Sequence, residues 1–123
     1  MTRERLSLGK KGEDLAVGQL RGLKYKILER NFKCALGEID IIAREKDTLV
    51  FVEVKTRRTR DFGGPAAAVN ARKQRQLSRV ALTYLNMKKL SQIPARFDVV
   101  AVELIPPAPR IEVLRDAFEL LYE

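Results

Sequence analysis

Histidine is absent from this chain of 123 residues, and its absence narrows the chemistry that the protein can perform. Histidine metal sites, serine–histidine or cysteine–histidine nucleophiles and histidine-dependent nucleases are all excluded. Any catalysis must therefore rest on carboxylates, lysine, arginine or tyrosine. The one cysteine, Cys34, excludes an intrachain disulfide and fits a reducing compartment, so we expect a cytoplasmic protein in which Cys34 is a small packing residue.

Long hydrophobic runs are missing as well. No stretch approaches the roughly 20 apolar residues of a membrane-spanning helix, and residues 1–11 contain no apolar core of a signal peptide. Internal repeats, linkers and low-complexity segments are not seen either. Because 123 residues suffice for one core and not for two, we expect one domain over residues 1–123.

Negative charge is scarce relative to positive charge. The chain has 24 lysines and arginines against 16 aspartates and glutamates, which gives a net charge of +8. With 46% hydrophobic residues, the composition predicts a folded chain. The excess positive charge favours a polyanionic partner, nucleic acid before an acidic membrane surface. We therefore expect nucleic acid as the partner, DNA rather than RNA, and no membrane.

Two segments rich in β-branched residues, 37–43 and 49–54, predict a β-hairpin. The second segment is apolar on both faces, which indicates a central, covered strand. A two-residue turn at 46–47 sets a register in which Asp40 lies opposite Glu53. A shift of one residue would move Asp40 to the other face of the sheet. The sequence thus predicts two carboxylates side by side on a central strand pair.

In the same register Lys55 shares the face of Asp40 and Glu53, and Glu38 lies opposite Lys55. Two opposed carboxylates repel each other unless a cation lies between them. Hard oxygen ligands favour a divalent ion, and Mg²⁺ fits best. The alternative is a plain charge ladder, in which Glu38 pairs with Lys55 and Asp40 is solvated.

Asp40 followed by Glu-Val-Lys at 53–55 resembles the Asp…Glu-X-Lys signature of the PD-(D/E)XK nuclease superfamily. The longer strings Gly-Glu-Ile-Asp at 37–40 and Val-Glu-Val-Lys-Thr-Arg at 52–57 resemble the uncharacterised bacterial YraN-like family, which is similar to the archaeal Holliday junction resolvases. The resemblance extends over residues 9–118. Two features depart from superfamily patterns: isoleucine rather than proline precedes Asp40, and the Gln-X-X-X-Tyr element of the RecB-like branch is absent.

This resemblance implies an α/β fold with a restriction-endonuclease-like core, and an endonuclease that hydrolyses DNA phosphodiester bonds with Mg²⁺ or Mn²⁺. Asp40 and Glu53 would bind the ion together with the Val54 carbonyl, and Lys55 would hold and help deprotonate the attacking water. Similarity to the resolvases further implies branched or junction DNA and a homodimer. The alternatives are a non-catalytic nucleic-acid-binding module on the same fold, and an adaptor for other DNA-processing proteins.

Residues 7–22 predict a first helix with Ser7 as its N-cap. Glu13 lies on the apolar face of this helix, whereas Asp14 is directed to solvent. Because resolvase-like nucleases place an additional acidic residue on this face, the resemblance implies that Glu13 binds the metal directly or through water. Otherwise Glu13 is an ordinary rim residue. The apolar face comprises Ala16, Val17, Leu20 and Leu23.

Positive charge gathers in two places after the hairpin. A basic loop over 56–65 follows the Glu-X-Lys strand, and a helix predicted over 66–89 carries a cationic stripe beside its apolar face. Both can hold a phosphate backbone, and the alternative in each case is ordinary solvated surface. The loop residues are Arg57, Arg58 and Arg60. The stripe consists of Arg72, Arg75 and Arg79, with Lys73 flanking it, and the apolar face consists of Leu77, Val80, Ala81 and Tyr84.

The remaining segments complete a sheet. Residues 24–33 predict a strand near an edge, and residues 96–104 predict another strand, in which Asp98 has no evident role. Residues 110–114 predict a last edge strand and 115–122 a short helix. The order helix, three strands, helix, strand, and then strand or helix predicts a mixed central sheet flanked by helices on both faces.

Overall fold

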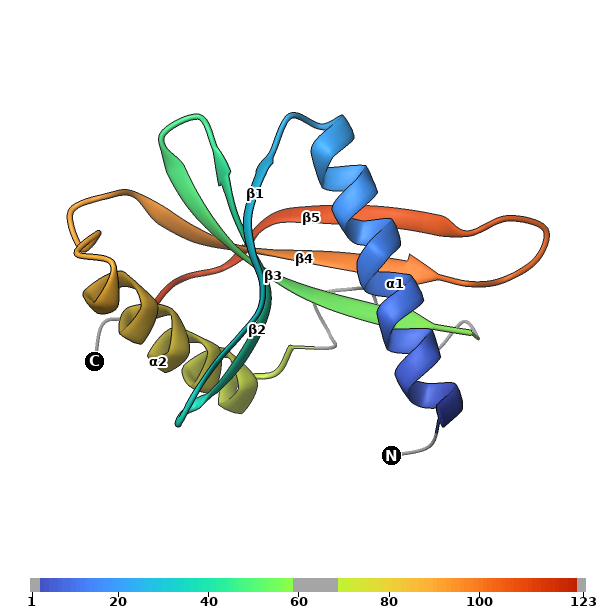
Figure 1. The fold of residues 1–123 in the computed structure, drawn as a ribbon, viewed down its shortest axis with the longest axis horizontal. Helices are drawn as coiled ribbons and strands as arrows, with labels where there is room; N and C mark the ends of the chain where they lie inside the picture. The colour runs from blue at the N-terminus through green and yellow to red at the C-terminus, as the bar shows by residue number, and fades with distance from the viewer. Residues whose placement is uncertain (1–2, 59–68, 122–123) are drawn as a thin grey trace.

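The computed structural model describes residues 3–58 and 69–121, with side chains from Leu8 onward. In this part of the chain, helices and strands form an α/β fold with one five-stranded mixed sheet (Figure 1), compatible with the expected restriction-endonuclease-like core. The elements are α1 (Arg3–Gly22), β1 (Lys26–Cys34), β2 (Gly37–Glu45), β3 (Thr48–Arg57), α2 (Ala71–Met87), β4 (Ala95–Glu103) and β5 (Arg110–Phe118).

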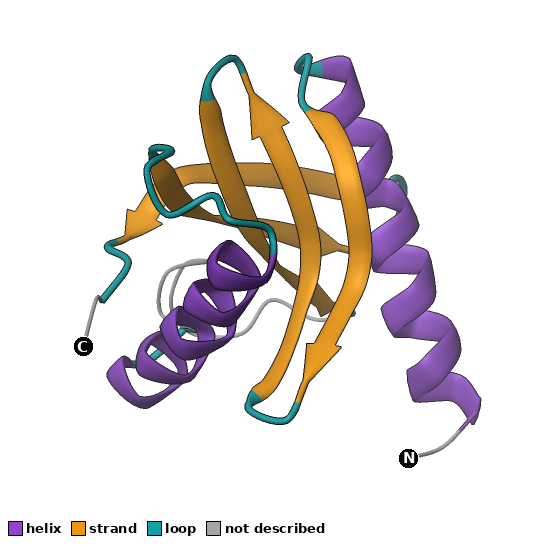
Figure 2. Ribbon diagram, turned by 60° about the vertical axis from the view of Figure 1, so that its left-hand side comes forward, coloured by secondary structure: helices purple, strands orange, loops and turns teal. Residues whose placement is uncertain are grey.

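The sheet has the strand order β1-β2-β3-β4-β5 and is antiparallel except for the parallel pair β3 and β4. A parallel pair needs a crossover connection, and α2 lies in that connection. Helices α1 and α2 cover opposite faces of the sheet (Figure 2). Strand β3 is central and is buried from Leu49 to Glu53, which confirms the prediction of a covered strand.

Helix α1 packs on the sheet through Ala16, Val17 and Leu20, which are buried as predicted. The helix approaches β3 most closely at Gly12. A Cβ atom at this position would overlap the side chain of Thr56, so only glycine permits the approach. This contact fixes the distance between the first helix and the strand that carries the Glu-X-Lys sequence.

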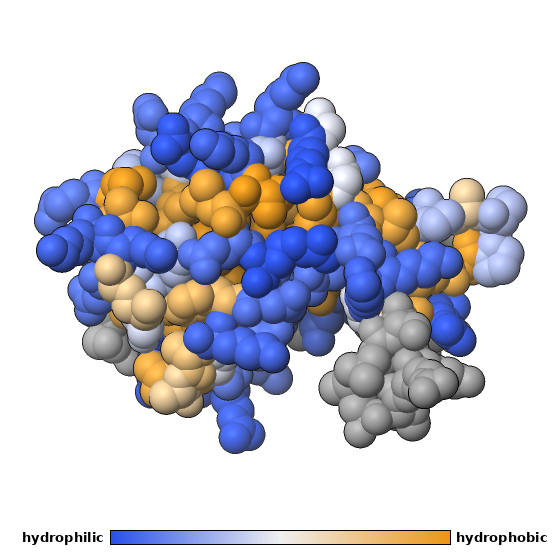
Figure 3. Space-filling model, in the orientation of Figure 1, coloured by the Kyte–Doolittle hydropathy of each residue, from blue (hydrophilic) through white to orange (hydrophobic). Residues whose placement is uncertain are grey.

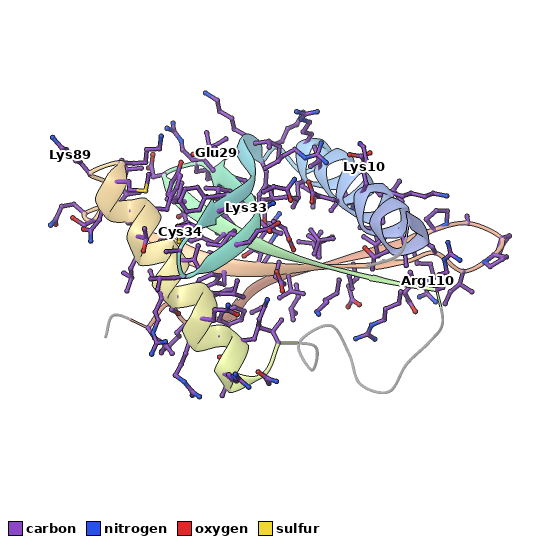
Figure 4. All side chains as sticks on the ribbon, turned by 60° about the horizontal axis from the view of Figure 1, so that its bottom comes forward. Lys10, Glu29, Lys33, Cys34, Lys89 and Arg110 are labelled. Carbon is purple, nitrogen blue, oxygen red and sulfur yellow. The ribbon has the colours of Figure 1, made fainter. Side chains whose placement is uncertain are left out.

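Helix α2 packs on the other face, through the stripe that the sequence predicted. The aromatic ring of Phe32 in β1 meets the ring of Tyr84 edge-to-face, with 5.1 Å between their centroids. Cys34 lies between β1 and α2 (Figure 4) and is half-buried against this core, as expected of a packing residue. The buried stripe of α2 consists of Leu77, Val80, Ala81 and Tyr84.

The helix ends differ from the predictions. Helix α1 begins at Arg3, so the predicted N-cap Ser7 lies inside it, and Leu23 follows its last residue and is exposed. Helix α2 begins later than predicted, because Asn70 is its N-cap and accepts a hydrogen bond from the Lys73 N–H at 2.9 Å. The first predicted residues of this helix, 66–68, lie outside the described residues.

The helix predicted over 115–122 was wrong. Strand β5 continues to Phe118, which pairs with Phe97 of β4, and the two rings stack with centroids 4.5 Å apart. Residues 119–121 are not helical either. Pairing with β4 and burial of the aromatic rings therefore override the weak local preference for a helix.

The hairpin of β2 and β3 has the predicted turn and register, and its ladder runs from the turn as far as the pair Ile41 and Val52. Beyond this pair β3 continues beside β4, while β2 turns away with β1 (Figure 1). The predicted opposition of Glu38 and Lys55 was therefore wrong. Glu38 is instead paired with Lys33 of β1, with 4.0 Å between the charged atoms.

The surface is mostly hydrophilic. On the face seen in Figure 3, hydrophobic residues form a band between hydrophilic ones. The described residues with large exposed hydrophobic side chains are Leu23, Leu28, Leu36 and Met87. None of the helices in the described ranges is long and apolar enough to cross a membrane.

Candidate functional site

Asp40 and Glu53 meet where β2 and β3 separate. At this fork Asp40 Oδ2 accepts a hydrogen bond from the Val54 N–H at 2.8 Å. The side chain of Asp40 thus bridges the two strands where the backbone ladder between them has ended. The carboxyl group of Asp40 also lies within hydrogen-bonding reach of the Glu53 carboxyl group. The structure therefore brings together the two carboxylates that the sequence register placed opposite each other.

The environment of this pair is unfavourable for two negative charges. Burial, followed by the charge and the hydrogen bond of Glu53, raises the pKa of Asp40 to about 7. The Val54 N–H and the charge of Lys73 act in the opposite direction. Glu53 is buried, with 7% of its surface exposed. Carboxyl groups in this position are stable when they share a proton or bind a cation.

An open cavity of about 870 Å³ lies among α1, β1, β2 and β3. Glu13 of α1, Asp40 of β2, and Val54 and Lys55 of β3 all line it, so the fold gathers these predicted residues around one space. Glu53 is not part of the lining. Its carboxylate extends toward α2, where the Nζ atom of Lys73 lies 3.7 Å away. The carboxylate pair thus lies between the cavity and α2.

Glu13 is directed toward β1, not toward the other carboxylates. Its carboxylate accepts hydrogen bonds from Arg30 Nε and Asn31 Nδ2, both at 3.0 Å. Arg30 also binds Asp14 at 2.6 Å. Sequence reasoning missed both β1 residues, which line the cavity. One of them carries a signal in the sequence, because asparagine is rare inside strands. In the structure Asn31 has φ 53°, a conformation that asparagine tolerates better than most residues.

The carboxyl oxygens at the fork are the candidate ligands for a divalent cation. No group of three or more acidic, cysteine or histidine side chains in the described ranges is arranged to hold a metal ion. Asp40 and Glu53 alone offer two hard oxygen donors in contact. Mg²⁺ is commonly held by one or two carboxylates, with water and substrate phosphate completing its shell. The two carboxyl groups therefore fit Mg²⁺ or Mn²⁺ only where water or a phosphate group supplies the remaining ligands.

The cationic stripe of α2 forms the second feature of the site. It lines a cavity of about 630 Å³ together with Leu36, Asn70 and Gln76. Lys73 belongs to this cavity and also approaches Glu53, so the cationic surface adjoins the carboxylate pair. Lys89 lies beyond the end of α2, and Arg110 lies at the opposite end of the molecule (Figure 4). The stripe consists of Arg72, Arg75 and Arg79, and the flanking Lys73 lines the same cavity.

The basic loop that was predicted to hold phosphate is only partly described. Arg57 is half-buried at the end of β3, and its N-terminal neighbours Lys55 and Thr56 line the first cavity. Arg58 is exposed and lines a smaller space beside α1. Arg60 lies outside the described residues. Among the described cationic residues, Lys73 of α2 approaches Glu53, and Lys10, Arg30 and Lys55 line the cavity beside Asp40.

Asp98, which had no predicted role, is fully buried in a polar network. It accepts hydrogen bonds from the Tyr25 hydroxyl at 2.6 Å, from Arg96 Nε at 2.9 Å and from the Asp116 N–H at 3.0 Å. Burial and the bond to Asp98 raise the pKa of Tyr25 to about 12, so this hydroxyl stays protonated and donates. Arg96 continues the network to Glu45 at 2.7 Å. Asp98 therefore joins β4 to β5, to the connection between α1 and β1 and, through Arg96, to the hairpin, as a structural residue.

The fold and the site together define an α/β protein whose mixed sheet forks at a pair of contacting carboxyl groups. Residues 12–102 match the model of the uncharacterised protein family UPF0102. UPF0102 proteins of Geobacter sulfurreducens, Geotalea uraniireducens and Syntrophus aciditrophicus are 54%, 56% and 52% identical to this chain. The matches cover 94%, 94% and 97% of this chain and 91%, 92% and 94% of the relatives. The chain therefore belongs to UPF0102, the family that its YraN-like strings indicated.

Proposed function

We propose that this protein is an endonuclease that hydrolyses DNA phosphodiester bonds with Mg²⁺ or Mn²⁺. The observation that carries the proposal is the contact between Asp40 and Glu53 at the strand fork, beside a cavity that Lys55 lines. Two carboxyl groups that repel each other lower stability, and such arrangements are typical of functional sites. A divalent ion between them removes the repulsion and gives the pair a function.

Each residue of the site has a distinct part in this reaction. Asp40 and Glu53 would hold the ion, which would supply positive charge and make a nearby water molecule more acidic. The Val54 N–H keeps the Asp40 carboxylate oriented. Lys55 donates hydrogen bonds to the attacking water and offsets the negative charge of the transition state. Arg30 and Asn31 hold Glu13 on the wall of the cavity, so Glu13 would contact the ion through a water molecule.

The α2 surface supports DNA as the substrate. Arg72, Arg75 and Arg79 are exposed on one side of the helix and line one cavity. Cationic side chains in such a row bind successive phosphates of a nucleic-acid backbone. Lys73 flanks this row and lies 3.7 Å from Glu53. A backbone bound along α2 would therefore lead to the carboxylate pair.

A nicking assay tests the proposal. Wild type, Asp40→Asn and Asp47→Asn are incubated with supercoiled DNA in Mg²⁺ and in Mn²⁺. Asp47 lies exposed in the β2–β3 turn, so its variant is a matched control. We expect Asp40→Asn to lower the rate by about a hundredfold or more, and Asp47→Asn to keep the wild-type rate. Equal activity of wild type and Asp40→Asn would refute the assignment.

A second candidate is a DNA-binding module without catalysis. The contacts of Glu13 with Arg30 and Asn31, and of Glu53 with Lys73, favour it because they engage carboxylates that a metal would otherwise use. In that case DNA binding persists in EDTA and weakens steeply with added salt. No product then appears with any divalent metal, and the same nicking assay separates the two candidates.

A further inference from the structure

The turn between β1 and β2 carries an exposed leucine in a cationic cavity. Leu36 has 51% of its surface exposed, and it follows Ala35 in the two-residue turn between the paired residues Cys34 and Gly37. Figures 1 and 2 show this turn projecting from the sheet beside the N-terminal half of α2. Leu36 lines the cavity that is otherwise polar, formed by the cationic stripe of α2 with Asn70 and Gln76.

The backbone of this turn lies in contact with α2. Gln76 Nε2 donates a hydrogen bond to the Leu36 carbonyl at 3.4 Å. Gly37 has φ 144°, and a Cβ atom there would lie 3.2 Å from Val80 Cγ2, so the lack of a side chain lets the turn approach the helix. The edge-to-face contact of Phe32 with Tyr84 fixes the strand that leads into the turn. The exposed side chain thus projects from a turn that lies against α2.

The surroundings of Leu36 indicate its ligand. The neighbouring arginines match phosphates, whereas a leucine side chain gains nothing from a phosphate and packs on apolar faces. In nucleic acid those faces belong to the bases, and they become accessible where a base is unstacked. Leucine is among the residues that proteins insert as wedges between base steps. A leucine surrounded by phosphate-binding side chains therefore suits DNA that is locally unstacked.

We propose that Leu36 is a wedge that packs beside an unstacked base, so that the protein selects DNA with a bulged or unpaired nucleotide over continuous duplex. The proposal rests on the proposed function in taking DNA as the ligand. It also predicts where the cut falls. Leu36 immediately precedes β2 and lies four residues before Asp40, about 13 Å at the usual rise of a strand. At about 3.4 Å per nucleotide, this separation places the cut about four nucleotides from the unstacked base.

Binding experiments test the wedge directly. The probes are a short continuous duplex and the same duplex with one bulged nucleotide, each with 2-aminopurine next to the bulge position, in EDTA. We expect wild type to bind the bulged probe about tenfold more tightly and to raise its fluorescence, which reports unstacking. Leu36→Ser should lose both effects, and Leu36→Met should keep them. Met87→Ser is the matched control, because Met87 is 60% exposed at the other end of α2.

The outcomes separate the wedge from the endonuclease. A wild type without preference for the bulge, or a Leu36→Ser variant that keeps the preference, would overturn the wedge. With Mn²⁺ added, cleavage by Leu36→Ser at the wild-type position would refute the wedge and leave the endonuclease in place. Loss of preference in Leu36→Ser, with no cleavage by wild type in any metal, would support the wedge and refute the endonuclease.

Discussion

Asp40 and Asp98 lie on the two strands that flank β3, and the fold surrounds their charges in opposite ways. Asp98 accepts hydrogen bonds from Tyr25, Arg96 and the Asp116 N–H. Asp40 accepts one backbone hydrogen bond and has another carboxyl group as its neighbour. A buried carboxylate whose partners all belong to the protein stabilises the fold. A carboxylate beside a second carboxylate needs a proton or an ion, and for this reason we assign Asp40 to function and Asp98 to structure.

The largest effect on stability is expected at Asp98. Asp98→Asn keeps the shape of the side chain and removes its charge, which leaves the half-buried Arg96 without this buried partner. We expect unfolding by urea to show a loss of about 3 kcal/mol, typical of breaking a buried ion pair. Asp47→Asn, in the exposed turn, should change the free energy of unfolding by less than about 0.5 kcal/mol. A similarly small loss for Asp98→Asn would contradict the assignment of Asp98 as a structural residue.

Metal should stabilise the protein through Asp40. A ligand that binds only the folded state adds about 2.7 kcal/mol at a hundredfold excess over its Kd. Thermal melts with saturating Mn²⁺ should therefore show a clear rise in Tm for wild type and for Asp47→Asn. Asp40→Asn should gain much less, because it lacks one of the two proposed ligands. An equal gain in Asp40→Asn would place the ion elsewhere.

In EDTA the contribution of Asp40 to stability should depend on pH. The pKa of Asp40 is raised in the folded protein from 3.8 to about 7. The folded chain therefore binds more protons than the unfolded chain between these values, so this group's contribution to stability falls as pH rises through that window. We expect Asp40→Asn to differ least from wild type below about pH 4 and to become progressively more stable than wild type as the pH rises to about 7, by at least about 1 kcal/mol near about pH 8.

Urea unfolding of both proteins across this pH range measures the difference. The sign is informative, since a strongly destabilised Asp40→Asn at about pH 8 would make Asp40 a structural partner, as Asp98 is. The proposed metal site would then lose its main support.

The smallest effects on DNA binding and on stability are expected from substitutions of single arginines. Arg75 is exposed in the α2 cavity, whereas Arg115 binds Glu45 within the network of Asp98. Arg75→Gln should weaken DNA binding a few-fold and lower the slope of log affinity against log salt by about one, with stability unchanged. Arg115→Gln should leave DNA binding unchanged and lower stability by less than about 1 kcal/mol. Equal DNA binding by Arg75→Gln and wild type would exclude α2 as the phosphate-binding surface.

Much of the core and the carboxylate pair could be predicted from the sequence, because the signals for them are local. The two-residue turn of the hairpin fixes side-chain parity, so the neighbours Asp40 and Glu53 followed from counting residues. The apolar stripe of α2 and the covered strand β3 likewise follow from periodicity and composition. These predictions needed no knowledge of distant contacts.

The predictions that were wrong or incomplete depend on contacts between distant segments. Glu38 and Lys55 do not face each other, because β3 leaves β2 to follow β4. Tyr25 and Asp98, which are 73 residues apart, meet only in the folded sheet, so the role of Asp98 could not be found from the sequence. Arg30 was missed for the same reason, since its contact with Glu13 depends on how α1 packs on β1.

A crystal of the wild-type protein soaked in Mn²⁺ tests the central claim most directly. Anomalous scattering identifies manganese itself, so its position does not have to be inferred from the surrounding protein atoms. Our account predicts a peak in contact with the carboxyl oxygens of both Asp40 and Glu53, and no such peak in Asp40→Asn crystals soaked in the same way. Carboxyl groups that remain hydrogen-bonded to each other, with manganese elsewhere or not bound, would contradict it.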